Sequence, residues 1–359
     1  MYCKQKIKQI VFIISSLKGG GAERVVSLLA NLFIREYSVT IILLSNEEVF
    51  YKLNKNIKIV KLDLSKKSNS ICSKVLNNYH RINKLKNAIK QEKADIVISF
   101  MTQTNILSII ATKSIGKKIL ISERTNYNFL KSKIWIFLRK FIYRFSDALI
   151  VQSDYDKNKY NFHKNIKVIF NPLKILPIKR ERDNIILAVG RVDYLKGYDR
   201  LINIYSKLST DWKLIIVGEG NQRKNIESLI SELNLEGRVI LEGRKNNIEE
   251  YYARAKIFAL SSRMEGFPNV LAEAMGHGCA CIAFDCLTGP RDIIDDGING
   301  YLVEDSNMEK YQIQLQKLVD NSDLRTKFSK EAKKIVERLD IDKISNEWLK
   351  IIQNITDKE

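Results

Sequence analysis

The first half of the chain alternates short apolar runs with segments of helical periodicity. The run QIVFIIS at residues 9–15 precedes residues 22–33, where apolar side chains recur at helical spacing. Four more apolar runs are typical of strands and lie at residues 39–45, 94–100, 118–123 and 147–153. Because these runs are nearly continuous, they predict a parallel sheet that helices cover on both faces.

The second half repeats this rhythm. The pattern predicts helices over residues 198–208 and 222–234, and strands at residues 185–190, 212–218, 238–243, 256–262 and 279–285. Two prolines and a charge cluster interrupt it between the halves, which indicates a linker near residues 171–183. We therefore expect an α/β fold with two doubly wound, Rossmann-like domains, at residues 1–170 and 184–340.

The tail is helical by pattern over residues 308–356, with a break at 338–342 where Asp342 is expected to cap the last helix. We expect residues 341–359 to form a C-terminal helix that crosses back to the first domain. Two domains suit a chain of 359 residues with 45% hydrophobic content. The first apolar run leads directly into a glycine turn, so it is interpreted as a strand and not as a signal peptide.

The five cysteines are odd in number and form no C-x-x-C pair, which favours reduced thiols over disulfides or structural zinc. The absence of a signal peptide and of an apolar run long enough to span a membrane predicts a cytoplasmic protein. Charge is distributed unevenly: residues 1–176 hold 32 Lys and Arg against 11 Asp and Glu, a net +21, whereas residues 177–359 hold 28 against 30. The excess in the first half predicts a polyanionic partner, either nucleic acid or an anionic lipid surface.

The stretch EGFPNVLAEAM at residues 265–275 places two glutamates around a proline. Pro268 is expected at the first position of a short helix, with Glu265 outside it and Glu273 inside it. Helical side chains tilt toward the N-terminus, so both carboxylates are expected to face one opening. An ordinary capped helix with a surface acid remains the alternative.

The backbone N–H groups between the two glutamates are expected to point outward at the positive end of the helix dipole, where they suit phosphate; they belong to Phe267, Asn269 and Val270. A nucleotide sugar presents hydroxyls, diphosphate and hydroxyls in the matching order. The stretch GRVDYLKG at residues 190–197 adds Arg191 and Lys196, two cations able to flank a diphosphate.

Glycine turns follow the first strand of the first half, at Gly19, Gly20 and Gly21, and a later strand of the second half, at Gly218. The triple glycine is not the spaced dinucleotide-binding fingerprint, so we expect it to let the backbone approach a ligand.

Together these stretches resemble the retaining glycosyltransferases of family four; they are GGGAERVV, SERTN (122–126), NP (171–172), GRVDYLKG, VGEG, EGFPNVLAEAM and DDGINGYLV (295–303). The resemblance spans nearly the whole chain and is nearest to bacterial enzymes of lipid-linked oligosaccharide or surface polysaccharide assembly. It implies the GT-B fold, with two domains facing a central cleft, and an α linkage formed with retention. It further implies an acceptor-binding first domain and a donor-binding second domain.

By this resemblance Glu265 contacts the donor sugar, Glu273 the ribose, and Arg191 with Lys196 the diphosphate. The same resemblance assigns donor binding to Gly20, Gly21, Gly218, Arg244, Gly266, Phe267, Pro268, Asn269 and Val270, and acceptor binding to Gly19, Lys74, Arg81, Glu123 and Arg124. Catalysis is assigned to Glu265, Arg191, Lys196 and Arg124.

Arg124 is a departure, because many relatives carry a histidine at this position of SERTN. Arginine does not relay protons near neutral pH, so we expect charge stabilisation instead, and the donor preference of histidine-bearing relatives is not transferred. Glu123 either has a structural role or lines the acceptor site, and the structural role is favoured.

No metal and no cofactor are expected. The acidic pair in DID (340–342) lies between helices and suits capping, and the three histidines (His80, His163 and His277) fit no metal spacing. No G-x-S-x-G elbow is found. With no enzymic nucleophile in view, the departing phosphate is expected to take the acceptor proton on the same face of the sugar.

Residues 129–145 predict a basic amphipathic helix with Ile134, Trp135, Phe137, Leu138, Phe141, Ile142 and Phe145 on one side and Lys133, Lys140 and Arg144 opposite. Such a helix can lie in an anionic membrane surface or pack its stripe on the sheet. The basic residues 74–93 are expected to hold a lipid-linked diphosphate or to contact headgroups.

These observations predict a retaining α-glycosyltransferase that moves a hexose or N-acetylhexosamine from a UDP-sugar to a polyprenyl-diphosphate-linked or polysaccharide acceptor. It is expected to work at the inner face of the cytoplasmic membrane, without nucleic acid. The alternatives are a sugar-nucleotide epimerase of the same fold and a nucleic-acid-binding protein.

Overall fold

The computed structural model describes residues 7–64 and 71–357, and the side chains of residues 71–75 lie outside the described part. The chain separates into two compact units. Unit 1 comprises Met1–Pro172 with Ile341–Glu359, and unit 2 comprises Leu173–Asp340. The units end within two residues of the expected positions 170 and 340, whereas unit 2 begins at Leu173, inside the linker expected at residues 171–183. The last helix belongs to unit 1.

Unit 1 contains one parallel sheet, whose described strands follow the order β3-β2-β1-β4-β5-β6-β7. Its central strands are buried on both faces, as the continuous apolar runs predicted. The outer strands β3 and β7 were not predicted, because β3 alternates apolar with exposed lysines and β7 is only three residues long. The strands are β1 (Gln9–Ile14), β2 (Ser38–Leu43), β3 (Lys58–Lys61), β4 (Ile96–Phe100), β5 (Lys118–Ser122), β6 (Ala148–Val151) and β7 (Ile166–Val168).

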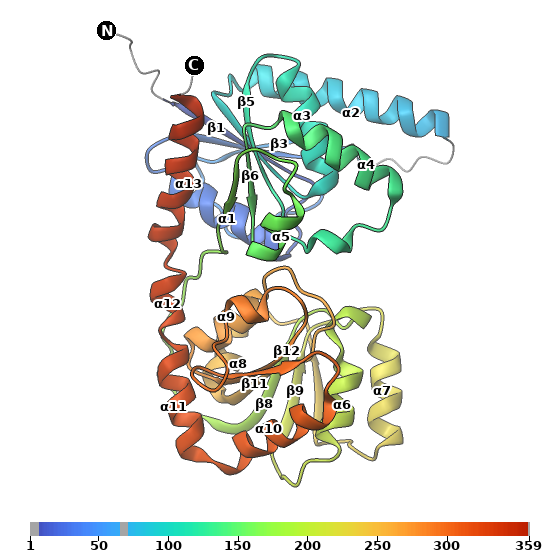
Figure 1. Ribbon diagram of the computed structural model, residues 1–359, viewed down its shortest axis with the longest axis vertical. Helices are drawn as coiled ribbons and strands as arrows, with labels where there is room; N and C mark the ends of the chain where they lie inside the picture. Colours follow the sequence, from blue (N-terminus) through green and yellow to red (C-terminus); the bar gives the residue numbers. More distant parts are fainter. Residues whose placement is uncertain (1–6, 65–70, 358–359) are drawn as a thin grey trace. The chain divides into compact units, whose positions relative to one another are not determined.

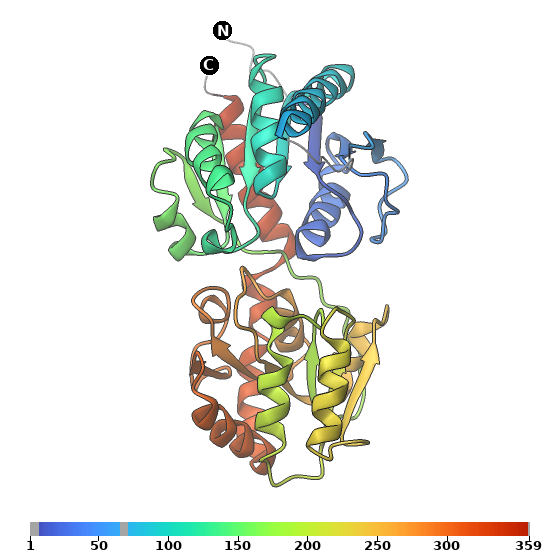
Figure 2. The same ribbon diagram turned by 90° about the vertical axis from the view of Figure 1, so that its right-hand side faces the viewer.

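Helices cover both faces of this sheet (Figure 1). One apolar layer joins α1 and α13 to the sheet, and a second joins α2 and α3 to the opposite face. Figure 2 shows α2 and α3 on the near side of the sheet and α13 on the far side. The helices of unit 1 are α1 (Gly21–Phe33), α2 (Ile71–Gln91), α3 (Thr102–Lys113), α4 (Lys133–Ile142), α5 (Asp154–Lys159) and α13 (Ile341–Thr356).

The helix α13 joins the core of unit 1 through Trp348, which is fully buried. Its indole stacks on Phe100 at the end of β4, with 5.8 Å between the ring centroids. Asp342 was expected to cap this helix, but the helix begins at Ile341, so Asp342 lies inside its first turn.

The helix predicted over residues 129–145 is divided into three parts: the 3-10 turns η1 (Tyr127–Phe129) and η2 (Tyr143–Phe145) enclose α4. The sequence predicted that the apolar residues share one side of the helix, but they do not. Trp135, Leu138 and Ile142 pack against the core, whereas an exposed stripe comprises Ile134, Phe137, Phe141 and Phe145. Arg139, which the sequence did not single out, is buried beneath the helix.

Unit 2 contains a second parallel sheet, in the order β10-β9-β8-β11-β12-β13. One apolar layer joins its strands to α6, α7, α10 and α11. On the other side, α8 contacts β8 and β11, and α9 contacts β11 and β12 (Figure 1). The strands are β8 (Asp183–Val189), β9 (Lys213–Val217), β10 (Val239–Gly243), β11 (Ala255–Leu260), β12 (Ala280–Asp285) and β13 (Tyr301–Glu304).

The helical elements of unit 2 are η3 (Tyr194–Lys196), α6 (Tyr198–Tyr205), α7 (Arg223–Glu232), α8 (Ile248–Arg254), α9 (Asn269–Gly276), η4 (Pro290–Asp292), α10 (Met308–Asp320), α11 (Ser322–Ala332) and α12 (Ile335–Arg338). The predicted helices of unit 2 are present, but α8 and η4 were not predicted, and the tail that was expected to be helical from residue 308 to the break at 338–342 is divided into α10, α11 and α12. The predicted fold class, with two doubly wound α/β domains, is confirmed. Within the described ranges, no helix has the length and apolar content needed to cross a membrane.

The strand order of each sheet reverses at one point. In unit 2 this point lies between β8 and β11, because the chain proceeds outward from β8 to β9 and then returns to pair β11 on the other side of β8. In unit 1 it lies between β1 and β4. Loops at the carboxyl ends of such strand pairs diverge, and open α/β sheets bind ligands there. Both sheets therefore have a preferred edge for a site.

The loops after β8 and β9 meet closely at Gly218. A Cβ atom on this residue would lie 1.8 Å from the carbonyl oxygen of Gly190, and its φ is +155°. The absence of a side chain is therefore required for the two loops to pack.

We predict that Gly218→Ala lowers the free energy of unfolding by about 2–4 kcal/mol, because overpacking adds to the cost of the backbone conformation. Gly237→Ala is the matched control, since its φ is also positive (+76°) but nothing lies within 4 Å of the added Cβ. Urea unfolding of both variants measures the difference. Equal losses would show that the close approach of the loops is unimportant.

Candidate functional site

The loop that leaves β8 is folded by short-range hydrogen bonds, and these fix Lys196. The Asp193 side chain caps η3 by accepting from the Lys196 backbone N–H at 3.2 Å. Gly197 then adopts a left-handed conformation at the start of α6. Ser261, at the end of β11, donates from its hydroxyl to the Lys196 carbonyl at 2.9 Å. The loops from β8 and β11 are thus joined at the reversal point of the sheet.

Lys196 and Glu265 form an ion pair across these two loops. Lys196 Nζ lies 2.6 Å from Glu265 Oε1, and the side chains are only 17% and 10% exposed. The Ser262 hydroxyl donates to the same Oε1 at 2.6 Å, and Thr288 donates to the backbone carbonyl of Glu265, also at 2.6 Å. Because little water screens this pair, its electrostatic interaction is stronger than that of an exposed pair.

The helix after Glu265 begins one residue later than predicted, at Asn269, so Pro268 precedes it. The expectation of freely available N–H groups is wrong for Asn269, whose N–H donates to the Phe267 carbonyl at 3.0 Å. This tight turn arises because proline constrains the backbone between the two residues. Within the described part of the chain, the N–H of Val270 has no acceptor and stays available at the positive end of α9.

Glu273 lies inside α9 but is more enclosed than the sequence suggested. It is 5% exposed, and its Oε2 accepts a hydrogen bond from the Tyr252 hydroxyl at 2.9 Å. The Tyr252 ring is stacked with the ring of His277, which ends the helix as expected. Helix α9 therefore holds one carboxylate of the predicted pair in a buried network, whereas Glu265 stands at the end of a loop.

Three further donor-site predictions lie on loops at the same edge of the unit 2 sheet, whereas Gly20 and Gly21 lie in unit 1 at the start of α1. Gly218 follows β9, and Gly266 lies between Glu265 and Phe267. Arg244 follows β10 and is exposed. The Arg191 side chain is 75% exposed and contacts Asp193 at 3.2 Å, so only Lys196 of the two predicted cations is held in a fixed position.

Tyr198 was missed by the sequence analysis, which treated it only as the start of a helix. It is 4% exposed, and its hydroxyl has no hydrogen-bond partner in the described part of the chain. A Cβ on Gly190 would lie 3.0 Å from this hydroxyl and 3.1 Å from Lys196 Cε, so Tyr198 lies beside the ion pair. Burial raises the Tyr198 pKa, and the nearby charges of Glu265 and Asp193 raise it further. Its hydroxyl thus stays protonated.

In unit 1, Glu123 lies at the end of β5 in a buried polar network. It is 2% exposed and accepts hydrogen bonds from Thr102 Oγ1 at 3.1 Å, from Asn105 Nδ2 at 3.4 Å and from the Tyr143 hydroxyl. Burial raises the Glu123 pKa, while these donors and the charge of Arg139 partly oppose the shift. Of the two roles considered for Glu123, this geometry supports the structural one.

Arg124 is also buried, and its Nη1 donates to Asn171 Oδ1 at 2.7 Å. The glycine turn is elsewhere on the same edge: Gly19 has a positive φ of 113°, Gly20 precedes α1, and Gly21 begins it. Arg81 on α2 is held by the Leu64 carbonyl at 3.1 Å and by Asn78 at 3.2 Å. The predicted acceptor residue Lys74 lies outside the described side chains.

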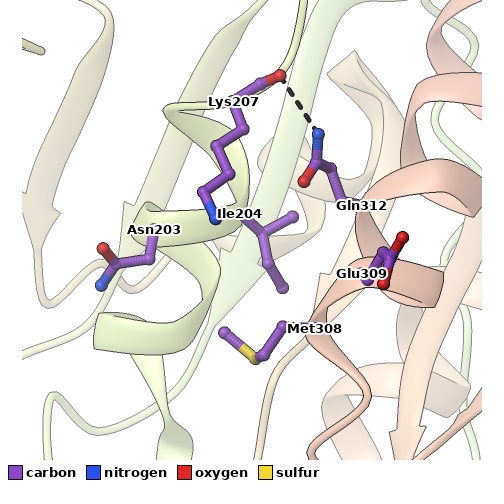
Figure 3. A pocket seen from close by; sticks show the side chains of 6 residues that line it. All are labelled: Asn203, Ile204, Lys207, Met308, Glu309 and Gln312. Carbon is purple, nitrogen blue, oxygen red and sulfur yellow. Dashed lines mark hydrogen bonds between the residues drawn. The ribbon is translucent and has the colours of Figure 1, made fainter.

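A shallow groove of about 370 Å³ lies between α6 and α10 of unit 2 (Figure 3). Its lining residues are Asn203, Ile204, Lys207, Met308, Glu309 and Gln312, and Gln312 donates to the Lys207 carbonyl at 3.3 Å. None of the predicted site residues lines it. Among the described residues, no group of three or more His, Cys, Asp or Glu is arranged to hold a metal ion. The described cysteines, Cys279, Cys281 and Cys286, are free and buried.

Two family models match the chain, one on each unit. Residues 19–174 match the model described as Glycosyltransferase Family 4, and residues 175–335 match Glycosyl transferases group 1. Among solved structures, sucrose-phosphate synthase from Thermosynechococcus elongatus has a similar fold, with a TM-score of 0.83 at 16% identity over 97% of this chain and 99% of that one.

Two curated relatives come from Campylobacter jejuni. The first is the GalNAc-alpha-(1->4)-GalNAc-alpha-(1->3)-diNAcBac-PP-undecaprenol alpha-1,4-N-acetyl-D-galactosaminyltransferase, 32% identical over 97% of this chain and 99% of the relative. The second is N-acetylgalactosamine-N,N'-diacetylbacillosaminyl-diphospho-undecaprenol 4-alpha-N-acetylgalactosaminyltransferase, 31% identical over 96% of this chain and 100% of the relative. Both relatives are named as transferases, and neither supports the epimerase alternative.

The raised Glu123 pKa predicts a pH-dependent loss of stability. Above its ordinary value of 4.5, the unfolded chain releases the Glu123 proton while the folded chain still holds it. Stability therefore falls as pH rises from about 4.5 through the raised pKa. In Glu123→Gln this contribution is absent, so its free energy of unfolding falls less over that range. Urea unfolding across pH measures the slope, with exposed Glu48→Gln as the control. Identical slopes for the wild type and Glu123→Gln would contradict the prediction.

Proposed function

This chain belongs to the family 4 glycosyltransferases, and from that premise we propose that it transfers a hexose or N-acetylhexosamine from a UDP-sugar. The proposed acceptor is a polyprenyl-diphosphate-linked oligosaccharide or a polysaccharide. The two Campylobacter relatives support this choice, because both are named for N-acetylgalactosamine transfer to undecaprenol-linked glycans. The donor configuration is retained, and the new linkage is α.

The Lys196–Glu265 ion pair is the observation that carries the proposal. It lies where the strand order of unit 2 reverses, and it presents one fixed cation beside one fixed carboxylate. Lys196 is suited to the donor diphosphate, whose charge grows as it departs. Glu265 is suited to the sugar hydroxyls, which donate to a carboxylate. The more exposed Arg191 is free to move toward the diphosphate when the donor binds.

The start of α9 extends the same site. The available N–H of Val270 and the helix dipole both favour a phosphate oxygen. Glu273, fixed by Tyr252, is assigned to the ribose hydroxyls of the donor. These residues thus provide a carboxylate, an anion site and a second carboxylate along one segment of the chain.

Proton transfer in the proposed reaction needs no enzymic base. The acceptor hydroxyl oxygen forms the new bond to the anomeric carbon on the face from which the UDP oxygen departs. The bond to that oxygen breaks, and the hydroxyl proton passes to the departing phosphate. The contribution of the protein is orientation and charge stabilisation by Lys196. We propose that neither a metal nor a cofactor is required.

The exposed stripe on α4 and η2 supports a membrane partner for unit 1. Ile134, Phe137, Phe141 and Phe145 are 71%, 68%, 53% and 54% exposed, and the rings of Phe141 and Phe145 contact each other. Lys133, Lys140 and Arg144 are exposed as well. The sequence predicted these cations opposite the apolar side. At 100° per residue they instead lie along one edge of the stripe.

Aromatic residues beside cations suit the interface of an anionic bilayer, where each cation near the surface contributes about 1 kcal/mol. The net charge of +21 over residues 1–176 acts in the same direction. We propose that the chain works at the inner face of the cytoplasmic membrane, where a lipid-linked acceptor and a cytosolic nucleotide sugar meet.

We predict that Glu265→Gln lowers kcat for sugar transfer at least 100-fold, because the amide removes the charge that Lys196 and the donor sugar require. Transfer of radiolabelled sugar to an undecaprenyl-diphosphate-linked glycan measures the rate. Glu232→Gln on the exposed face of α7 is the control and should leave kcat unchanged. Circular dichroism verifies folding. A folded Glu265→Gln variant with wild-type turnover would refute the assignment.

For the membrane proposal, the double change Phe137→Ser and Phe141→Ser should lower partitioning onto phosphatidylglycerol vesicles at least tenfold, since two exposed rings no longer enter the interface. Vesicle co-sedimentation measures this, and Ile313→Ser removes a 50% exposed apolar side chain from unit 2 as the control. Phosphatidylcholine vesicles should bind less of the wild type. Equal sedimentation of both variants would exclude α4 as the membrane contact.

A further inference from the structure

Arg124 is fixed in unit 1 by contacts that use only part of its guanidinium group. Its Nη1 donates to Asn171 Oδ1 at 2.7 Å, and Gln152 Nε2 donates to the same oxygen, also at 2.7 Å. The guanidinium carbon lies 5.6 Å from the Phe100 ring centroid and 5.2 Å from that of Trp348. Arg124 is 7% exposed, so these neighbours enclose it almost completely.

The other two nitrogens of Arg124, Nε and Nη2, have no hydrogen-bond partner in the described part of the chain. They carry the parallel pair of N–H bonds on one edge of the guanidinium, the edge that binds both oxygens of a carboxylate or phosphate. Asn171 accepts from the remaining nitrogen, Nη1. The orientation of Arg124 therefore leaves its bidentate edge unused.

The adjacent Glu123 does not use this edge. Its oxygens accept from Thr102, Asn105 and Tyr143, and no hydrogen bond to Arg124 is formed. Burial lowers the Arg124 pKa to about 9, although the charge of Glu123 opposes that shift. Burying a cation with two unused donors is unfavourable, and an added oxyanion would relieve this cost.

Two further features adjoin Phe100, whose ring lies beside the guanidinium. The indole Nε1 of Trp348 is a third buried donor without a partner among the described residues. Met101, next to Phe100 at the end of β4, has a φ of +75°, which is strained for a residue with a side chain. Both occur at the carboxyl edge of the unit 1 sheet, close to its reversal point between β1 and β4.

We propose that Arg124, with the Trp348 indole beside it, forms an oxyanion subsite of unit 1 that binds a phosphate group of a substrate. Small side-chain movement opens the edge of the guanidinium to the ligand. The inference rests on the proposed transferase function, because donor and acceptor each supply such a phosphate. In this proposal Arg124 binds a phosphate through two parallel hydrogen bonds. This role adds to the charge stabilisation expected from the sequence.

The test measures binding of two phosphate probes to the full chain by calorimetry. UDP represents the donor, and farnesyl diphosphate represents the lipid diphosphate of the acceptor. Arg124→Met should raise the Kd of one probe at least tenfold. Arg124→Lys should recover only part of the affinity, because lysine lacks the parallel pair of N–H bonds. Lys164→Met removes one exposed cation before β7, at the opposite edge of the sheet, and should change neither Kd.

The probe that loses affinity identifies the source of the phosphate, and a loss for either one supports the subsite. Trp348→Phe keeps the ring but removes the indole N–H, so it should weaken the same probe about threefold. It also provides the test if Arg124→Met does not fold. Unchanged Kd values for both probes in folded Arg124→Met, or in Trp348→Phe if that variant alone folds, would overturn the subsite.

Failure of the subsite and failure of the transferase proposal give different results. If both Kd values are unchanged while the wild type still transfers sugar, the subsite is rejected and the transferase proposal stands. If the wild type transfers no sugar with any nucleotide sugar, the proposed function fails, whereas loss of probe binding in Arg124→Met would still support the phosphate site.

Discussion

The proposed chemistry depends on the ion pair between Lys196 and Glu265. Two separate loops, from β8 and β11, supply its partners, and the Ser261 and Ser262 hydroxyls connect those loops to the pair. The pair is mostly removed from water, so breaking it without replacement would leave a partly buried charge. A donor that offers hydroxyls to Glu265 and a diphosphate to Lys196 replaces these interactions with equivalent ones. In the proposed site, both partners are therefore held in position before a donor binds.

Each sheet gathers its polar residues at the carboxyl edge but does so differently. Unit 2 pairs Lys196 with Glu265, whose side chains stay 17% and 10% exposed, and the close approach of Gly218 to Gly190 brings two loops together. Unit 1 buries Glu123 and Arg124 beneath aromatic side chains, one of which comes from the returning helix α13. The second arrangement is costly in stability, which is the physical reason to look for a ligand there.

Much of this organisation was predictable from the sequence. Continuous apolar runs indicate buried parallel strands, and glycine turns after them mark the ligand-binding edge of the sheet. The motif EGFPNVLAEAM correctly placed Glu265 outside a short helix and Glu273 inside it. What could not be predicted depends on contacts between distant segments. The burial of Glu273 under Tyr252, the unpartnered hydroxyl of Tyr198 and the position of Trp348 beside Arg124 have no local signal.

The α4 helix shows the same limit at the surface. Its apolar residues outnumber those that one face can bury, and hydrophobic periodicity alone did not divide them into a packed set and an exposed stripe. The packing of Trp135 and Leu138 against the core made that division, and it leaves Phe137 and Phe141 to solvent. One helix thus combines core packing with an exposed apolar stripe, so the packing of α4 does not exclude the proposed membrane contact.

The most direct test of the central claim is calorimetric titration of UDP into the wild type and into Lys196→Met. If the ion pair marks the donor site, the substitution raises the Kd for UDP at least tenfold, because the diphosphate loses its fixed cation. Equal affinity of the two folded proteins for UDP would contradict the account, since the diphosphate would then bind elsewhere.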